Sequence, residues 1–428
     1  MEIKDLNLED GIINLFNFTL NDDSKAMLRK LLLTPLPSKE SALERQHILK
    51  GFLANMNLYE NYSYSKIDFR EALTFLDTFS DKEYLPKRLK LKLRLSRSKF
   101  YRYRSKCIQL VLLLHRLHSH YITKLSLAPF PDSYKAEIRF LDDFLYSFRP
   151  AHYERLIRGN KFGIPHIVEI IHIISAKKQK LEIEAFHEKY TLFEAHLSAA
   201  TGIHWHGFVF PEFSDSGLSL QDFYHPLLEK PVKNSLETTT NVILLTGPNM
   251  SGKSTLLRAI GLCVYLGNIG FAIPARGGLM PFYHDISIFI NLNDDLQSGY
   301  SHFMTEVVNL KKTVLTARSG NPALAIFDEL FRGTNNEDAL EISRATLRGL
   351  LNFPQSLFFI SSHLHQLTAM EEITSGAIAC HYLDCSLQNE TPAFTYELKE
   401  GWSDVKIGRI LFEKEGLAEL LGEQQNSK

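Results

Sequence analysis

The sequence has few cysteines and no long apolar run. Its four cysteines, at positions 107, 263, 380 and 385 of 428 residues, are too few and too scattered for a disulfide framework, which fits a reducing compartment. The longest apolar runs, such as Ile108–Leu114, are far shorter than the ~20 residues of a membrane-spanning helix. The first ten residues, MEIKDLNLED, lack the basic start and apolar run of a signal peptide. We therefore expect a soluble, cytoplasmic protein without membrane contact.

The chain also lacks a net charge that would draw it to nucleic acid. Its formal charge is −1, so any such attraction must come from a local group of residues. Apolar residues make up 44% and charged residues 23%, an ordinary globular balance. The length allows two or three domains with sizeable cores.

The first 230 residues carry a mainly helical pattern. Apolar positions recur at intervals of three and four in Ile12–Leu33 and in Ser41–Leu58, and Pro35 and Pro37 separate the two segments. This part of the chain is therefore predicted to be a helical domain, 1–230.

After about residue 238 the pattern changes to short apolar runs between helical segments. Strands are expected at 241–246, 323–327 and 357–360, and helices after residue 252 and at 304–317 and 338–351. Such alternation is typical of an α/β domain with a mostly parallel sheet. The runs 377–387 and 393–398 flank a polar turn and indicate an antiparallel hairpin on the sheet edge.

A basic stretch stands apart from both halves. Between residues 87 and 106 there are ten basic residues and no acidic one, with aromatic residues interleaved. Such a run suits phosphate contacts and base stacking, which makes Arg97, Lys99, Arg102 and Arg104 candidates for contacts with DNA. The alternative is a solvated face whose leucines, at every second position from 89 to 95, are buried on the other side.

Residues 247–255 fit the phosphate-binding pattern G-x-x-x-x-G-K-[ST], between an expected strand and an expected helix. The glycines let the backbone N–H groups point at phosphate oxygens. Lys253 would reach the β- and γ-phosphates, and Ser254 would ligate Mg²⁺. The candidate residues for binding ATP are Gly247, Pro248, Asn249, Met250, Ser251, Gly252, Lys253, Ser254 and Thr255.

Polar residues follow two further strands. Asp328, after the run 323–327, would hold Mg²⁺, and Glu329 would polarise the attacking water. His363, after the run 357–360, would lie at the same sheet edge and could sense the γ-phosphate. The alternatives are surface carboxylates for the first pair and a structural histidine for the second.

Taken together, these segments resemble the MutS family of DNA mismatch repair ATPases. Thr246–Thr255 is similar to its phosphate loop, with Asn249 and Met250 as the telling pair, and 294–306 is similar to D-D-L-x-S-G-x-S-T-F-M-x-E. Asp328–Thr334 resembles D-E-[IL]-G-R-G-T, and Ser362 with His363 resembles the start of T-H-Y. Weaker similarity begins near Leu32, so the resemblance spans most of the chain.

The resemblance implies an ABC-type ATPase, at 231–428, that works as a homodimer around two nucleotides. Ser301 would contact a γ-phosphate held by the phosphate loop of the partner. Asn249 would line the phosphate loop of its own chain. Val232 falls where the family tends to place an aromatic that packs on adenine. The chain departs from the pattern at several positions, namely Tyr300 for Arg, His302 for Thr, Phe331 for Gly and Leu364 for Tyr.

The resemblance also limits the expected function. The family's mismatch-reading domain would lie before residue 1, residues 1–230 would form a helical core and lever, and the C-terminal dimerisation helices look truncated. We therefore expect an ATP-dependent DNA-binding protein that switches DNA or partner binding without reading mismatches, with other repair proteins as further partners. The rival is a nucleotide-switched protein scaffold that does not bind DNA. A transporter subunit is disfavoured because the signature L-S-G-G-Q is absent.

Overall fold

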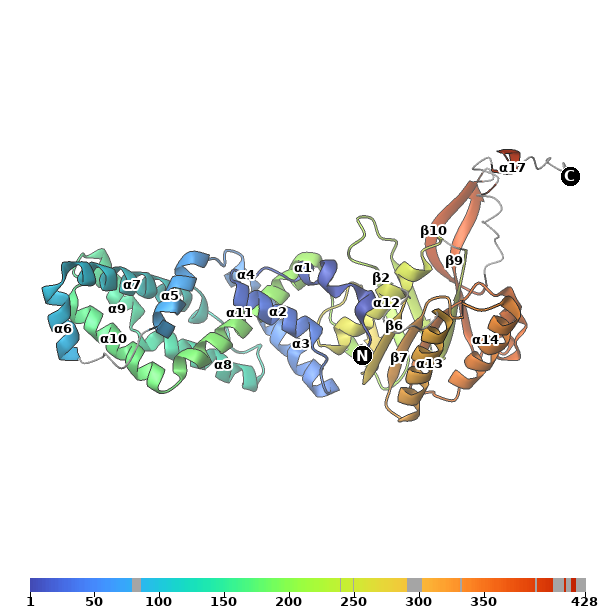
Figure 1. The fold of residues 1–428 in the computed structure, drawn as a ribbon, viewed down its shortest axis with the longest axis horizontal. Helices are drawn as coiled ribbons and strands as arrows, with labels where there is room; N and C mark the ends of the chain where they lie inside the picture. Colours follow the sequence, from blue (N-terminus) through green and yellow to red (C-terminus); the bar gives the residue numbers. More distant parts are fainter. Residues whose placement is uncertain are drawn as a thin grey trace. The chain divides into compact units, whose positions relative to one another are not determined.

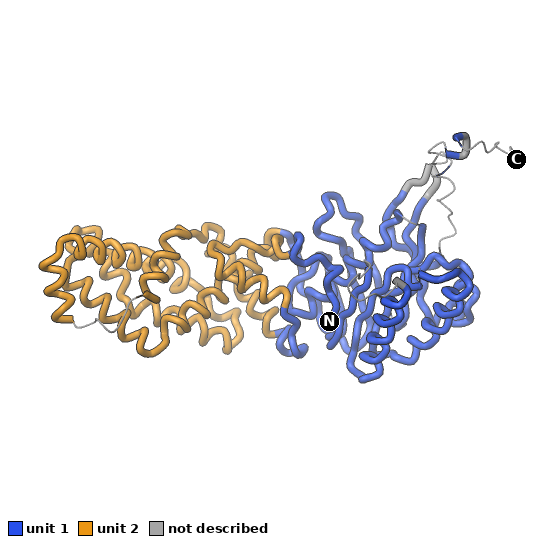
Figure 2. The backbone as a smooth tube through the Cα atoms, viewed as in Figure 1, with its two compact units in different colours: residues 1–12, 34–43, 206–428 blue, residues 13–33, 44–205 orange. Residues whose placement is uncertain are grey.

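The chain folds into two compact units in a computed structural model. The structure describes residues 1–78, 86–238, 240–248, 250–290, 302–331, 333–388, 391–402, 412 and 417–420. Unit 1 comprises residues 1–12, 34–43 and 206–428, and unit 2 comprises 13–33 and 44–205 (Figure 2). This division differs from the boundary at residue 230 expected from the sequence. Three segments before residue 230, namely 1–12, 34–43 and 206–230, belong to the α/β unit.

Unit 2 is helical, as expected for most of the N-terminal half. Its longer helices are built on apolar positions three and four residues apart, and α7 begins after Ser96, whose side chain accepts a hydrogen bond from Lys99 N. The helices that lie wholly or mostly in this unit are α1 (Ile13–Leu15), α2 (Asp22–Leu33), α3 (Lys39–Leu53), α4 (Met56–Tyr59), α5 (Lys66–Thr78), α6 (Pro86–Leu95), α7 (Arg97–Arg116), η4 (Leu117–Ile122), α8 (Asp132–Ser147), α9 (Pro150–Arg158), α10 (Ile164–Gln179) and α11 (Glu182–His206).

A buried carboxylate ties several segments of unit 2 together. Glu194, on α11, accepts hydrogen bonds from Leu20 N at 2.6 Å and from the Tyr64 hydroxyl at 2.5 Å. Asn21 also donates to it, at 3.2 Å. Burial raises the pKa of Glu194 above its usual value, against the effect of these donors. The network fixes the chain before α2 and the chain before α5 on the long helix α11.

Unit 1 is built on a six-stranded sheet in the order β10-β9-β4-β8-β7-β6 (Figure 1). Five strands of this sheet run parallel to one another, from β9 through β4, β8 and β7 to β6. The edge strand β10 pairs with β9 antiparallel. Their bounds are β4 (Val242–Thr246), β6 (Asp285–Phe289), β7 (Ala323–Phe327), β8 (Leu357–Ser361), β9 (Ala379–Gln388) and β10 (Thr391–Glu400).

Helices cover both faces of this sheet. Val242 and Leu244 on β4 belong to a buried cluster with α13 (His302–Arg318) and α14 (Asn336–Leu350). Ile243 and Leu245, which point the other way, lie near α12 (Lys253–Asn268). Because alternate side chains of a strand face opposite sides, a strand covered on both faces is apolar throughout, and all five β4 residues are buried.

A second, four-stranded sheet in the order β1-β5-β2-β3 completes unit 1. It is formed by β1 (Glu212–Phe213), β2 (Leu218–Phe223), β3 (Asn234–Thr238) and β5 (Gly277–Met280). Two of these strands lie before residue 230, where the sequence indicated helix, so that expectation was wrong for 212–223. In β2 the alternation of buried residues is interrupted by a register shift between Leu220 and Phe223, so this short strand shows no sustained period of two.

The start of the chain covers the β6 edge of the large sheet. Glu2 N donates to Ile286 O, and Ile288 N donates to Glu2 O. The terminal ammonium of Met1 lies 3.0 Å from Asp285. These bonds pair backbone groups that an edge strand otherwise exposes. In the described part of the chain, no helix has the length and apolar composition needed to cross a bilayer.

Candidate nucleotide site

The expected phosphate loop connects the central strand β4 to the start of α12. Gly247 and Gly252 have φ of 139° and 95°, a region that side chains with a Cβ disfavour. A Cβ at Gly252 would also lie 3.1 Å from the Tyr396 ring. The loop therefore needs glycine at both positions. It leads directly into the N-terminus of α12, and the N-terminus of a helix is the end that binds anions.

Lys253 is the cation of this loop and is almost fully buried. Its ammonium donates to Gly247 O at 2.8 Å and to Pro248 O at 3.1 Å. It lies 3.7 Å from a carboxylate oxygen of Glu329, and the two side chains are 5% and 11% exposed. A buried ammonium needs such partners, so the lysine and the glutamate compensate each other's charge within the site.

Asp328 lies between two serine hydroxyls from neighbouring elements. Ser254, in the first turn of α12, donates to Asp328 Oδ2. Ser361, the last residue of β8, donates to Asp328 Oδ1 at 2.5 Å and accepts a hydrogen bond from Glu329 N at 2.7 Å. A hydroxyl and a carboxylate held together at this edge are oxygen ligands of the kind that Mg²⁺ prefers. The sequence did not assign a role to Ser361.

The backbone after Asp328 is strained. Glu329 and Phe331 have φ of 53° and 69°, although neither is glycine. A residue with a Cβ pays about 1–2 kcal/mol in this left-handed region, so it persists only where the surroundings fix it. Strain of this kind beside a carboxylate pair is common at functional sites.

The remaining residues expected in the site lie in different situations. His363 follows β8 by two residues at the same sheet edge and is exposed. Met250 is 73% exposed, and the Ser251 hydroxyl is buried with no hydrogen-bond partner among the described residues. Asn249, Ser301 and the segment 294–300 lie outside the described residues.

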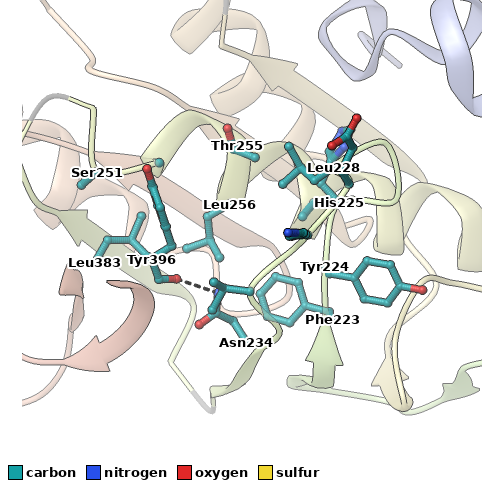
Figure 3. Close-up of a pocket in the computed structure, with 15 residues that line it drawn as sticks. Phe223, Tyr224, His225, Leu228, Asn234, Ser251, Thr255, Leu256, Leu383 and Tyr396 are labelled. Atoms are coloured by element: carbon teal, nitrogen blue, oxygen red, sulfur yellow. Dashed lines mark hydrogen bonds between the residues drawn. The ribbon is translucent and has the colours of Figure 1, made fainter. Parts of the chain in front are cut away.

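A pocket of about 320 Å³ opens beside the phosphate loop. Ser251, Gly252 and Thr255 form its loop side, and it continues over apolar side chains away from the loop. In Figure 3, Leu383 and Tyr396 lie on one side and Tyr224, His225 and Leu228 on the other. Burial lowers the pKa of His225, which favours a neutral ring at pH 7. The pocket combines apolar side chains with polar ones, among them Glu229 and Lys230, a mixture that suits a small molecule with apolar and polar parts.

The Tyr396 ring lies beside Gly252 of the loop, and the sequence did not single this residue out. It lies on β10, where the register with β9 shifts between Phe394 and Leu398, and its φ is 59°. Asn234 fixes this irregular turn of the strand by donating to Tyr396 O at 3.1 Å and accepting from Leu398 N at 2.8 Å (Figure 3). Val232, the residue expected beside adenine, also lines the pocket and is 39% exposed.

The basic stretch forms the helices α6 and α7. Leu89 and Leu93 are buried one helical turn apart, whereas Leu91 is 58% and Leu95 78% exposed. The alternative in which every second leucine is buried is therefore wrong, because the segment is a helix with a period of 3.6 residues and not a strand. The α6 surface thus carries exposed leucines among its basic residues.

The four candidate DNA contacts differ in their surroundings. Arg97, Lys99 and Arg102 are exposed, and the Arg97 guanidinium lies 5.8 Å from the centre of the Tyr101 ring. Arg104 is half-buried and donates to Phe162 O at 3.3 Å and to Asn160 at 3.4 Å. These bonds give Arg104 a structural role within unit 2.

Residues 243–419 match the family model described as MutS domain V. Bacterial proteins described as DNA mismatch repair protein MutS are similar to the chain. The protein of Bacillus licheniformis is 34% identical over 209 residues, 47% of this chain and 24% of the relative. That of Bacillus subtilis is 33% identical over 222 residues, 50% of this chain and 25% of the relative. That of Oceanobacillus iheyensis is 29% identical over 256 residues, 58% of this chain and 27% of the relative.

The matched segments thus make up about half of this chain and about a quarter of these relatives. The family model covers the phosphate loop, the carboxylate pair after β7 and the segment after β8. The ends of these elements are joined in the structure by the contact of Lys253 with Glu329 and by the bonds from Ser254 and Ser361 to Asp328. By these comparisons, residues 243–419 are similar to domain V of the MutS family.

Proposed function

We propose that unit 1 binds ATP with Mg²⁺ and hydrolyses it. The observation that carries this proposal is the convergence of a glycine loop, a buried lysine and two carboxylates at the start of α12. The start of the helix and the lysine suit phosphate groups, and the oxygen ligands suit a metal ion. Together they fit a metal-bound polyphosphate better than any other small ligand.

Each residue of the site would have a different role in binding or hydrolysing ATP. Lys253 and the backbone N–H groups of the loop would bind the β- and γ-phosphate oxygens. Ser254 and Asp328 would hold Mg²⁺, which when bound offsets phosphate charge. Glu329 would orient and deprotonate the attacking water, and His363 would sense the γ-phosphate. The contact with Lys253 supports this role by placing the Glu329 carboxylate beside the loop.

The pocket beside the loop would hold the adenosine part of ATP. Its apolar lining and its position next to Gly252 support this assignment. The Tyr396 ring would pack on the base, with Val232 as a weaker contact on the pocket wall. Val232 lacks an aromatic face, so Tyr396 carries the larger share of the proposed stacking.

Two proposed residues come from the family resemblance alone. Asn249 would line the phosphate loop, and Ser301 would reach a γ-phosphate bound by a second copy of the chain. The ATP-bound protein would then be a homodimer, at least transiently, with two composite sites. Assembly would follow mass action, because each site needs a residue from both copies.

We further propose that unit 2 binds DNA through α6 and α7, as the helical lever of an ATP-switched DNA-binding protein. Exposed Arg97, Lys99 and Arg102 support phosphate contacts, and Tyr101, 52% exposed, supports stacking. Other repair proteins would be further partners. The rival scaffold function predicts no DNA affinity, so a salt titration of DNA binding separates the two.

Calorimetric titration of the protein with ATP, with and without Mg²⁺, together with phosphate release, tests the proposed ATPase. We expect saturable binding that strengthens with Mg²⁺ and release of phosphate at a measurable rate. Absence of ATP binding would overturn the proposal, and binding without phosphate release would reduce it to a nucleotide switch.

A further inference from the structure

Phe331 occupies an unusual position two residues after Glu329. Its φ is 69°, yet it carries a large side chain that is only 2% exposed. The family pattern that the segment resembles has glycine here, a residue that adopts this conformation without strain. The chain therefore keeps an aromatic residue where the backbone favours glycine, and the surroundings must hold it in place.

The ring of Phe331 is held in the buried cluster between the sheet and α13 and α14. The partly buried Phe303, in the first turn of α13, packs against the same cluster, with the two ring centres 6.1 Å apart. Gly333 also lies close to this turn, since a Cβ on it would be 2.8 Å from Phe303 N. The segment after Glu329 is thus closely packed on the start of α13 at two points.

Glu329 lies between two fixed points. On one side its own N–H is bonded to Ser361 Oγ at 2.7 Å, and on the other the Phe331 ring is buried. Its φ of 53° is itself strained, so free rotation of the segment would relax it toward another conformation. Between these two points the Glu329 carboxylate lies 3.7 Å from the Lys253 ammonium.

We propose that Phe331 is a positioning residue that holds the Glu329 carboxylate against Lys253 and connects it to the start of α13. This inference rests on the proposed ATPase. In that reaction a base misplaced by about 1 Å lowers the rate of the chemical step, whereas ATP binding depends on the loop and the pocket. Loss of the ring should therefore lower kcat and leave KM almost unchanged.

The test compares three substitutions of Phe331 in the full chain. Phe331→Gly removes both the ring and the strain, Phe331→Ala removes the ring and keeps the strain, and Phe331→Leu keeps an apolar anchor. We expect kcat to fall at least tenfold in the glycine and alanine variants, with KM for ATP within twofold. The leucine variant should retain kcat within about threefold of the wild type.

Phe353→Ala is the matched control. Phe353 packs on the same buried cluster but lies before β8, at the sheet edge opposite to Glu329. We expect this variant to lower the melting temperature and to leave kcat within twofold. If Phe353→Ala lowers kcat as much as Phe331→Gly, or if Phe331→Gly keeps the wild-type kcat, the proposal is wrong.

Hydrogen exchange of the Glu329 amide gives a readout that does not need ATPase activity. In the wild type this amide is bonded to Ser361 Oγ, so it should exchange slowly. Phe331→Gly should raise its exchange rate at least tenfold, and Phe353→Ala should not. A wild-type protein without ATPase activity would overturn only the proposed function, whereas unchanged exchange in Phe331→Gly would overturn the positioning role.

Discussion

Ser361 donates a hydrogen bond of 2.5 Å to Asp328, from the end of β8 to the end of the neighbouring strand β7. The same hydroxyl accepts the backbone N–H of Glu329. One serine therefore orients the residue proposed to hold Mg²⁺ and the residue proposed to act as base. Partners of this kind commonly change metal affinity or activity ten- to hundredfold when they are removed.

We expect Ser361→Ala to lower the ATPase rate about ten- to hundredfold and to raise the Mg²⁺ concentration needed for half-maximal activity. The alanine leaves Asp328 without one donor and Glu329 N without its acceptor. Phosphate release measured against Mg²⁺ concentration checks this. Ser362→Ala is the control, because the Ser362 hydroxyl is bonded to Leu364 N and not to the carboxylates. Equal effects of the two substitutions would contradict the assigned role.

Tyr396→Ala should weaken ATP binding about tenfold or more, since aromatic stacking on a base contributes about 1–3 kcal/mol. Tyr396→Phe should bind like the wild type, because the ring remains and Asn234 bonds the backbone oxygen, not the hydroxyl. Val232→Ala should change the affinity less than threefold. Calorimetry with Mg-ATP separates the three. An alanine variant at position 396 with wild-type affinity would place the base elsewhere.

Reversal of Arg97, Lys99 and Arg102 to Glu should weaken DNA binding at least tenfold at moderate salt. It should also make the slope of log K against log salt less negative by about 2 to 3. Each of the three lost phosphate contacts contributes about −0.9 to that slope. Basal ATPase activity should stay unchanged. The measurement is fluorescence anisotropy of labelled duplex DNA across a salt series.

The control carries the same change of charge elsewhere in unit 2. Lys25, Lys30 and Lys124 are exposed and lie outside α6 and α7, so their reversal to Glu should affect affinity less. Arg104 is left out of the test, because its bonds to Phe162 and Asn160 make a loss of stability the expected result. Undiminished DNA binding after reversal of Arg97, Lys99 and Arg102 would show that α6 and α7 are a solvated face and do not form the DNA contact.

Mixing two inactive variants tests the composite site. Ser301→Ala and Lys253→Ala should each be inactive alone, and a mixture should regain part of the activity. In the mixed dimer one site lacks both residues and the other keeps both. ATPase activity per subunit should also rise with protein concentration. A strict monomer with bound ATP in sedimentation, and no activity in the mixture, would remove the dimer from the proposal.

The sequence predicted the elements of the α/β unit well where a motif and an apolar run coincide. The expected strand 323–327 is β7, and the expected hairpin at the sheet edge is β9 and β10. Buried strands are mostly apolar runs, and Gly247 marks where β4 ends. These are local signals that do not depend on the rest of the fold.

The sequence did not predict features that depend on tertiary contacts. Tyr396 reaches the loop because Asn234, 162 residues earlier, fixes an irregular turn of β10. Ser361 was one of two adjacent serines, and only the pairing of β8 with β7 shows which of them meets Asp328. The alternative that every second leucine from 89 to 95 is buried was wrong, because only Leu89 and Leu93, one helical turn apart in α6, pack inside.

The central claim is that Lys253 binds the phosphates of ATP and that Glu329 drives hydrolysis. Parallel measurement of Mg-ATP affinity and phosphate release for Lys253→Ala, Glu329→Gln and the wild type tests it most directly. The account predicts that Lys253→Ala loses tight binding, because the buried cation of the loop is gone. Glu329→Gln should bind Mg-ATP at least as tightly as the wild type and release phosphate at least a hundredfold more slowly. Undiminished phosphate release by Glu329→Gln, or wild-type affinity in Lys253→Ala, would contradict it.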